Sequence, residues 1–129
     1  MNALENRIRE LRQRYAQTLP ERLASIARTL IQAGEAMQAG ETNIPRAELL
    51  RQFHTLAGTA GTFGFEDIAT LAADAECILS TASVPYVTPG EVERLASRLL
   101  DLDAALRRHL EGVGSHGAAW STFEGGGVL

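Results

Sequence analysis

Lysine is absent from this sequence of 129 residues, so every one of its twelve basic residues is an arginine. Acidic residues outnumber the arginines, and the net charge is −4. The longest basic block is Arg107-Arg108, and the arginines between residues 7 and 14 are accompanied by Glu5 and Glu10. A nucleic-acid-binding domain usually carries a basic stripe. We therefore expect no nucleic-acid partner and interpret the arginine-rich segment as a solvated helix face.

Cysteine occurs only once, as Cys77, which excludes an internal disulfide and a cysteine-based metal site. A lone cysteine in a helix usually serves as a small core residue, so we expect Cys77 in the core. The sequence also lacks a long apolar run for a membrane span and a signal-like segment at its start. These absences predict a cytoplasmic protein that has no membrane partner.

Aromatic residues make up only 5% of the chain, whereas hydrophobic residues make up 45% and include many alanines and leucines. This composition favours helices packed through small side chains, and the length suits one domain with a modest core. Half of the twelve glycines lie in residues 112–129. We therefore assign residues 1–111 to the folded domain and predict a flexible glycine-rich tail over 112–129. Two uses of Trp120 and Phe123 in that tail stay open: a docking motif, and loose packing onto the domain.

Apolar residues recur with the period of an α-helix in five segments before residue 111. In chain order, these stripes are Leu4, Ile8, Leu11 and Tyr15; Leu19, Leu23, Ile26, Leu30, Ala33 and Met37; Leu49, Phe53, Leu56, Ala60 and Phe63; Phe65, Ile68, Leu71 or Ala72, Ala75 and Ile78; and Val92, Leu95, Leu99, Leu102 and Leu106. No segment has the pattern of a strand. The stripes predict an all-α protein, an antiparallel up-down four-helix bundle with a short additional N-terminal helix that covers one end.

Proline, glycine and capping residues predict where these helices begin and end. Pro20, with Thr18 and Glu21 at capping-box spacing, predicts a new or kinked helix after the short first one. Gly40 predicts a helix end, and Gly64 predicts the break between the third and fourth stripes. Thr88-Pro89-Gly90-Glu91 is a capping box with proline at the first helical position, which predicts a start for the last helix. That helix is expected to end at about Leu110, with His109 in its last turn.

His54 follows the core residue Phe53, so it lies on the flank of the core stripe. Ala57, Gly58 and Gly61 come three, four and seven residues later and share its helical face. The imidazole therefore stands over a strip with few side chains, open to another protein. Because these positions hold no metal-ligand side chains and a bundle flank has no oxyanion hole, neither a metal site nor a hydrolase site is expected. A surface histidine, with glycines that ease helix–helix contact, stays the alternative reading of this pattern.

The segment FHTLAGTAGTFGF, residues 53–65, resembles the signature of histidine-containing phosphotransfer (HPt) domains. That signature is His-x-x-Lys-Gly, then small residues, then a hydrophobic-Gly step into the next helix, and the resemblance extends over residues 4–110. It implies that His54 accepts a phosphoryl group from a receiver-domain aspartate and passes it to another receiver, with Gly58 giving the receiver access. The implied partners are response-regulator receiver domains and a hybrid sensor histidine kinase, and the implied state is a monomer.

Two further positions follow from the resemblance. Many HPt domains place a Gln or Glu on the neighbouring helix, where it hydrogen-bonds Nδ1 of the histidine, and the corresponding residue here is Glu76. His54 lies ten positions before Gly64 and Glu76 lies twelve after it, so a hairpin of helices would bring them together. Where the family usually has lysine, this chain has Ala57. Arg51, one turn before His54, is a candidate for the missing cation, and an ordinary solvated arginine is the alternative.

The chain contains neither a Gly-rich phosphate loop nor a kinase-type motif. We therefore expect a phosphoryl carrier that is not an enzyme and has no cofactor of its own, with Mg²⁺ supplied by the partner receiver. One alternative is an HPt-like adaptor that binds and sequesters a receiver or kinase domain without being phosphorylated, which Ala57 favours. Another is an unrelated helical adaptor that works through Trp120 and Phe123.

Overall fold

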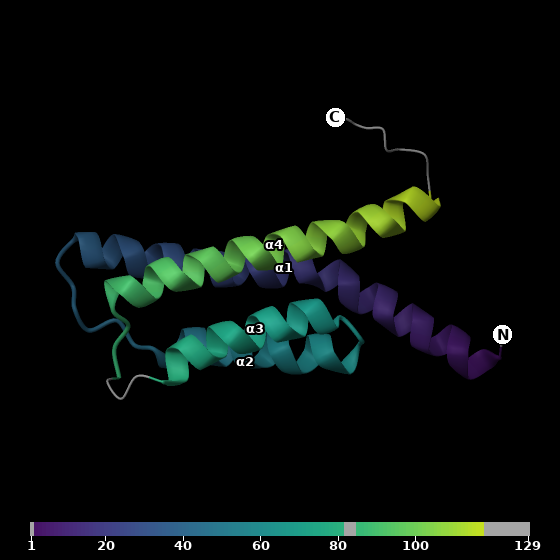
Figure 1. Cartoon of the computed structure of the whole chain (residues 1–129), viewed down its shortest axis with the longest axis horizontal. Coiled ribbons are helices and arrows are strands. Elements are labelled where there is room, and N and C mark those ends of the chain that lie inside the picture. Colours follow the sequence, from purple (N-terminus) through teal and green to yellow (C-terminus); the bar gives the residue numbers. More distant parts are fainter. Residues whose placement is uncertain (1, 82–84, 118–129) are drawn as a thin grey trace.

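The computed structural model describes residues 2–81 and 85–117, which form four α-helices packed into a bundle (Figure 1). Helix α1 spans Ala3–Gln38, α2 spans Ala47–Thr62, α3 spans Glu66–Ser80 and α4 spans Pro89–Gly117. Those residues contain no strand, and an isolated β-bridge joins the loops at Pro45 and Tyr86. The predicted all-helical architecture is therefore confirmed.

The apolar stripes of the four helices meet in one core. Its largest fully buried side chains are Phe53, Leu19, Leu49, Leu56, Ile68, Leu79, Leu95 and Leu102. Burying one side chain of this size stabilises the fold by roughly 1.5–3 kcal/mol, so the stripes hold the helices together. Of the two residues left open in the fourth stripe, Ala72 is fully buried and Leu71 is partly buried. Leu79 is also fully buried, although the predicted stripe did not include it.

The separate N-terminal helix is wrong, because α1 continues through Pro20 as one helix of 36 residues. A proline in a helix interior removes a backbone hydrogen bond and costs roughly 3 kcal/mol. Pro20 is on the exposed side of α1, whereas its neighbour Leu19 is fully buried and core residues continue on both sides. This burial offsets the cost of the proline. Thr18 does not cap Glu21 as predicted but donates its hydroxyl to the carbonyl oxygen of Tyr15.

The N-terminal part of α1 extends past the α2–α3 pair instead of covering an end of the bundle (Figure 1). The first two residues of its predicted stripe, Leu4 and Ile8, are exposed, whereas the last, Tyr15, is buried in the core. Arg12 and Tyr15 hold this part in place: Arg12 Nε donates to the carbonyl oxygen of Phe63 at 2.7 Å, and the Tyr15 ring stacks on the Phe63 ring. The Arg12 guanidinium also lies 5.0 Å from the centroid of the Phe65 ring. Arg12 therefore attaches α1 to the turn between α2 and α3.

Helices α2 and α3 form a hairpin around Gly64, whose φ of 83° lies in the left-handed region that glycine adopts most readily (Figure 1). The predicted helix break at Gly64 is therefore confirmed. Residues at similar distances from this turn face each other, as the contacts of His54 with Glu76 and of Gly61 with Ala69 show. This hairpin brings the predicted site residues of the two helices together.

Two other predicted helix ends are also confirmed. Gly40 follows the end of α1 with a φ of 95°. At the start of α4, the backbone N–H of Thr88 donates to Glu91 Oε1 at 2.8 Å, and the N–H of Glu91 donates to Thr88 Oγ1 at 3.2 Å. These two bonds are the predicted capping box.

Helix α4 continues to Gly117, beyond the end expected at about Leu110. The first part of the expected tail is therefore helical. Residues 118–129, including Trp120 and Phe123, lie outside the described residues. Among the described residues, no helix is long and apolar enough to span a membrane.

Candidate functional site

His54 and Glu76 meet on the exposed side of the α2–α3 hairpin. Nδ1 of His54 lies 2.7 Å from Oε2 of Glu76, within hydrogen-bond distance. The histidine side chain is 74% exposed, whereas that of Glu76 is 29% exposed. Because the neighbouring Phe53 is fully buried in the core, α2 is fixed in an orientation that turns His54 outward. The structure therefore contains the predicted contact between these two residues, and the role of each residue stays a prediction.

The hydrogen bond determines which nitrogen of a neutral His54 ring is available for chemistry. A carboxylate oxygen without a proton only accepts hydrogen bonds, so in this contact the N–H at Nδ1 is the donor and Glu76 is the acceptor. In the neutral ring, Nε2 then carries the lone pair. Since the ring is mostly exposed, this nitrogen is accessible to an electrophile on another molecule. The pair has the arrangement of an oriented nucleophile on an open surface.

Gly58 has no packing role inside the described structure. A Cβ built at this position would meet no atom within 4 Å, although glycine in a helix interior costs roughly 1 kcal/mol relative to alanine. At Gly61 a Cβ would lie 3.8 Å from the Cβ of Ala69, which is ordinary contact. The alternative reading, in which these glycines ease helix–helix contact, is therefore wrong for Gly58. The open strip beside His54 has no internal cause and suits an external partner.

Ala57 and Arg51 place no cation against His54. Ala57 is partly buried and packs against the core. Arg51 forms two hydrogen bonds with Glu48, one turn before it, with distances of 2.6 and 3.1 Å. The hydrogen bond with Arg51 lowers the pKa of the Glu48 carboxyl, and the same bond raises the pKa of Arg51. To reach His54, one turn after it, Arg51 would have to leave Glu48, and its role as the missing cation stays a prediction.

Cys77 lies next to Glu76 on α3 and is exposed, so the prediction that it is a core residue is wrong. The core positions of α3 include Ala72, Ala75 and Leu79. Cys77 lies about 200° around the helix from Ala75, on the opposite face. Its exposure follows from the phase of this stripe.

His109 was expected in the last turn of the final helix, but α4 continues beyond it and His109 instead bonds to α3. Its Nε2 lies 2.9 and 3.1 Å from the two carboxylate oxygens of Asp67, and its ring packs edge-on against Phe65. Burial alone would raise the pKa of Asp67. The hydrogen bonds from His109 and from the backbone N–H of Ile68 outweigh that effect, so this pKa is lowered. His109 thus stabilises the α3–α4 contact.

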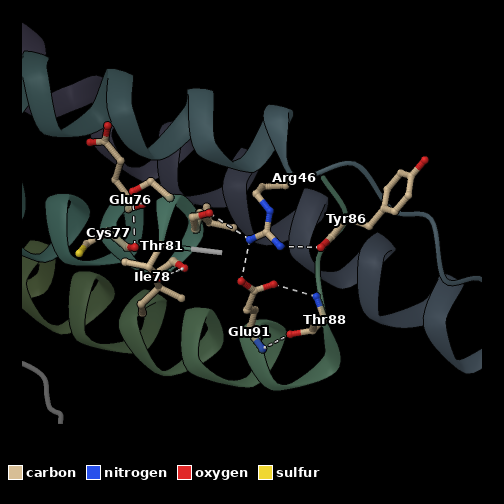
Figure 2. Close-up of polar contacts among 10 residues, drawn as sticks. Arg46, Glu76, Cys77, Ile78, Thr81, Tyr86, Thr88 and Glu91 are labelled. Carbon is tan, nitrogen blue, oxygen red and sulfur yellow. Dashed lines mark hydrogen bonds and ion pairs between the residues drawn. The ribbon is translucent and has the colours of Figure 1, made fainter. Parts of the chain in front are cut away.

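A buried ion pair at the other end of the hairpin was not predicted from the sequence (Figure 2). Arg46 and Glu91 are 7% and 3% exposed, and Arg46 Nη1 lies 2.6 Å from Glu91 Oε2. Arg46 Nη1 also donates to the carbonyl oxygen of Leu79, and its Nη2 donates to that of Tyr86. The pair therefore joins the start of α2, the end of α3, the following loop and the start of α4. The ion pair thus helps to fix the positions of α2, which carries His54, and α3, which carries Glu76.

The charge of Glu91 is stabilised despite its burial. Burial alone would raise the pKa of this carboxyl, but the hydrogen bonds from Arg46 and from the Thr88 backbone lower it below its ordinary value. Glu91 was predicted only as a capping residue. Its ion-pair partner lies 45 residues away in sequence, and no local pattern connects the two.

Among the side chains that the structure describes, those of residues 2–81 and 85–111, no group of three or more histidine, cysteine or carboxylate side chains is close enough to hold a metal ion. The described site thus consists of one exposed imidazole, one carboxylate and an open strip of small residues. A helical module of this kind can present a nucleophilic nitrogen to the active site of another protein.

Comparison with known proteins identifies this class more closely. The family model of the Hpt domain matches residues 10–111, which is most of the chain. This chain belongs to the Hpt domain family, whose members carry phosphoryl groups on histidine in phosphorelays and interact with receiver domains. Searches among curated proteins and among solved structures gave no match.

Proposed function

We propose that this protein is a phosphoryl carrier that accepts a phosphoryl group on His54 from the aspartate of a receiver domain and passes it to another response regulator. The observation that supports this function best is the 2.7 Å contact between Nδ1 of His54 and Glu76, combined with a ring that is 74% exposed. In this proposal the four helices run antiparallel in up-down order, so that α2 and α3 present His54 and Glu76 side by side at the surface. A hybrid sensor histidine kinase is the proposed source of the phosphoryl group, and the carrier acts as a monomer.

In the proposed transfer, the lone pair of His54 Nε2 attacks the phosphorus of the aspartyl phosphate. The N–P bond forms while the bond from phosphorus to the aspartate oxygen breaks, and the aspartate leaves as a carboxylate with that electron pair. Nδ1 keeps its proton throughout, because Glu76 accepts a hydrogen bond from it. The negative carboxylate also stabilises the positive charge that develops on the ring during the attack. The transfer to the second receiver is the reverse of this reaction.

The small residues of the motif have a steric role in this proposal. Gly58 lies one turn after His54 on the same face, and the space over it is open. A receiver domain can therefore bring its aspartate close to Nε2 without meeting a side chain from this turn. Gly61 extends the same open strip by one further turn. The Mg²⁺ that assists the transfer belongs to the receiver.

The experiment is incubation with a panel of phosphorylated receiver domains from the same genome, followed by analysis of the phosphate on this protein. We expect acid-labile, base-stable phosphate on the parent protein and none on His54→Gln. The substitution should leave the thermal melting curve nearly unchanged because the ring is exposed. The matched control is His109→Gln, which should still be labelled. Labelling of His54→Gln would refute the assignment.

A second candidate function is an adaptor that binds a receiver or kinase domain without accepting phosphate. The observation that favours it is that no arginine bonds to His54 in the part of the chain that the structure describes, since Arg51 is bonded to Glu48 and residue 57 is alanine. The same panel discriminates the two functions. Receiver binding with no transfer to His54 would support the adaptor, and labelling of His54 would exclude it.

A further inference from the structure

A groove of about 290 Å³ lies between α1 and α2, and two of the α2 residues that line it, Arg51 and Thr55, are close to His54 in sequence. Its lining residues are Glu21, Arg22, Ser25 and Ile26 from α1 and Arg51, Gln52, Thr55 and Leu56 from α2. On α2, Arg51 and Thr55 lie about 60° and about 100° around the helix from His54 in one direction. Helix α3 lies in the opposite direction, where Gly61 faces Ala69. The histidine therefore stands between Glu76 on one side and this groove on the other.

The groove has a fixed cation on its α1 side. Nε of Arg22 donates to Thr18 Oγ1 at 2.8 Å, and the Arg22 guanidinium lies 5.2 Å from the centroid of the Tyr15 ring. These contacts hold the guanidinium in one place. Within residues 2–81 and 85–117, Arg22 forms no ion pair with a carboxylate. Its charge therefore remains available to an anion from outside.

Two other side chains in the groove wall, Glu21 and Gln52, add no uncompensated charge to it. The carboxylate of Glu21 is bonded to Arg28 at 2.7 Å, so its charge is compensated. The amide of Gln52 is partly buried, with Nε2 donating to Ser25 Oγ at 3.3 Å and with no partner for Oε1 among the described residues. Because Oε1 of Gln52 is buried, this amide forms part of the groove wall and does not face an anion in the groove.

We propose that this groove receives an acidic side chain of the partner receiver domain, an aspartate or glutamate that pairs with Arg22. A planar guanidinium binds a carboxylate through two parallel hydrogen bonds, which gives both attraction and orientation. Thr55, which lines the groove, lies about 60° around α2 from Gly58, so a receiver docked over the open space at Gly58 can reach both His54 and Arg22. In this proposal, Arg22 helps to bind the receiver domain that exchanges a phosphoryl group with His54, so the inference rests on the proposed function.

The test measures binding of purified receiver domains from the same genome to the unphosphorylated parent protein, to Arg22→Gln and to Arg22→Lys. The matched control is Arg107→Gln on α4, which removes the same charge from an exposed arginine that does not line the groove. Arg22→Gln should raise the Kd about five- to tenfold and weaken its dependence on salt, because an interfacial charge pair is lost. Arg22→Lys should recover only part of the affinity, because an ammonium keeps the charge but cannot form the two parallel hydrogen bonds, and Arg107→Gln should match the parent. Thermal melting curves confirm that each variant is folded.

Equal affinities for Arg22→Gln and Arg107→Gln would overturn this inference. A titration with inorganic phosphate could overturn it as well. If phosphate shifted the Gln52 amide signals in NMR spectra with a Kd in the micromolar range, while Arg22→Gln left receiver binding unchanged, the groove would be a site for small anions. Phosphoramidate can phosphorylate a histidine without any receiver. Labelling of His54 by phosphoramidate with no effect of Arg22→Gln on docking would refute the docking contact alone. A parent protein that binds no receiver and is not labelled would refute the proposed function as well.

Discussion

Replacement of Gly58 by glutamine should make the protein more stable and a poorer phosphoryl carrier. A Cβ at this position meets no atom within 4 Å, so the new side chain has room and no neighbour has to move. Glutamine has a much better helix propensity than glycine in a helix interior, by up to about 1 kcal/mol. For a chain of 129 residues, a gain of that size raises Tm by about 4 °C.

The loss of transfer has a different cause. Residue 58 lies one turn after His54 on the same exposed face, and glutamine adds a side chain long enough to reach beside the ring. A receiver that must bring its aspartate to Nε2 would meet this side chain. We expect transfer from a phosphorylated receiver to slow by at least about tenfold, which corresponds to about 1.4 kcal/mol in the activation free energy. Gly58→Ala should show a smaller effect in the same direction.

The assay combines thermal melting with single-turnover transfer from a receiver that labels the parent protein. Gly34→Ala is the matched control, because Gly34 is also inside a helix, on α1, and a Cβ there likewise meets nothing within 4 Å. It should raise Tm by a similar amount and leave transfer unchanged. Labelling of His54 by phosphoramidate should be nearly the same in all variants, since this small donor does not need the space that a receiver needs. Transfer at the parental rate by Gly58→Gln, or a lower Tm, would refute the steric explanation.

Three further predictions concern Glu76 and the buried ion pair of Arg46 with Glu91. Glu76→Ala should slow labelling of His54 about tenfold, because it removes a hydrogen bond to a charged group worth about 1.5–3 kcal/mol, at the lower end for a partly exposed pair. Glu76→Gln keeps an acceptor for Nδ1–H and should lose less, and equal rates for the parent and Glu76→Ala would contradict the orienting role. Arg46→Met should lower the free energy of unfolding by about 3–5 kcal/mol, because it leaves the buried Glu91 carboxylate unpaired, whereas the double variant Arg46→Met/Glu91→Leu should lie closer to the parent. The folded pKa of Glu91 is below its ordinary 4.5, so the stabilisation by this carboxylate is present above pH 4.5 and is lost as the pH falls through the folded pKa. The Tm of the parent should therefore fall more steeply on acidification than that of the double variant, and equal slopes would refute this account.

Much of the site could be predicted because it depends on short-range geometry. The period of an α-helix places Phe53 on the apolar stripe that faces the core and the next residue, His54, on the flank of that stripe, where it is exposed. Gly64 breaks the helix through its own backbone conformation, and this turn brings residues at similar distances on both sides together. The resemblance to HPt domains named Glu76 as the partner of His54, and these two local features explain why the two residues meet.

The features that the sequence did not reveal depend on residues far apart in the chain. Pro20 has the local pattern of a helix start, yet core packing on both sides keeps α1 continuous. Cys77 is exposed because the buried stripe of α3 continues through Leu79, a choice of phase that packing against the other helices determines. A local pattern cannot weigh such contacts, because their energy comes from surfaces that meet only after folding.

Charged residues show the same difference between local contacts, which the sequence indicates, and long-range contacts, which only the folded structure reveals. The sequence alone identified Glu91 as a capping residue, because both hydrogen bonds of the box are made within three residues. Only the tertiary structure decided that this carboxylate also neutralises Arg46, which lies 45 residues away, and that Arg22 on α1 lines a groove with α2 residues that are close to His54 in sequence. A capping bond is fixed by the backbone geometry of a single turn, whereas an arginine side chain can bond to any acceptor that folding brings within its reach.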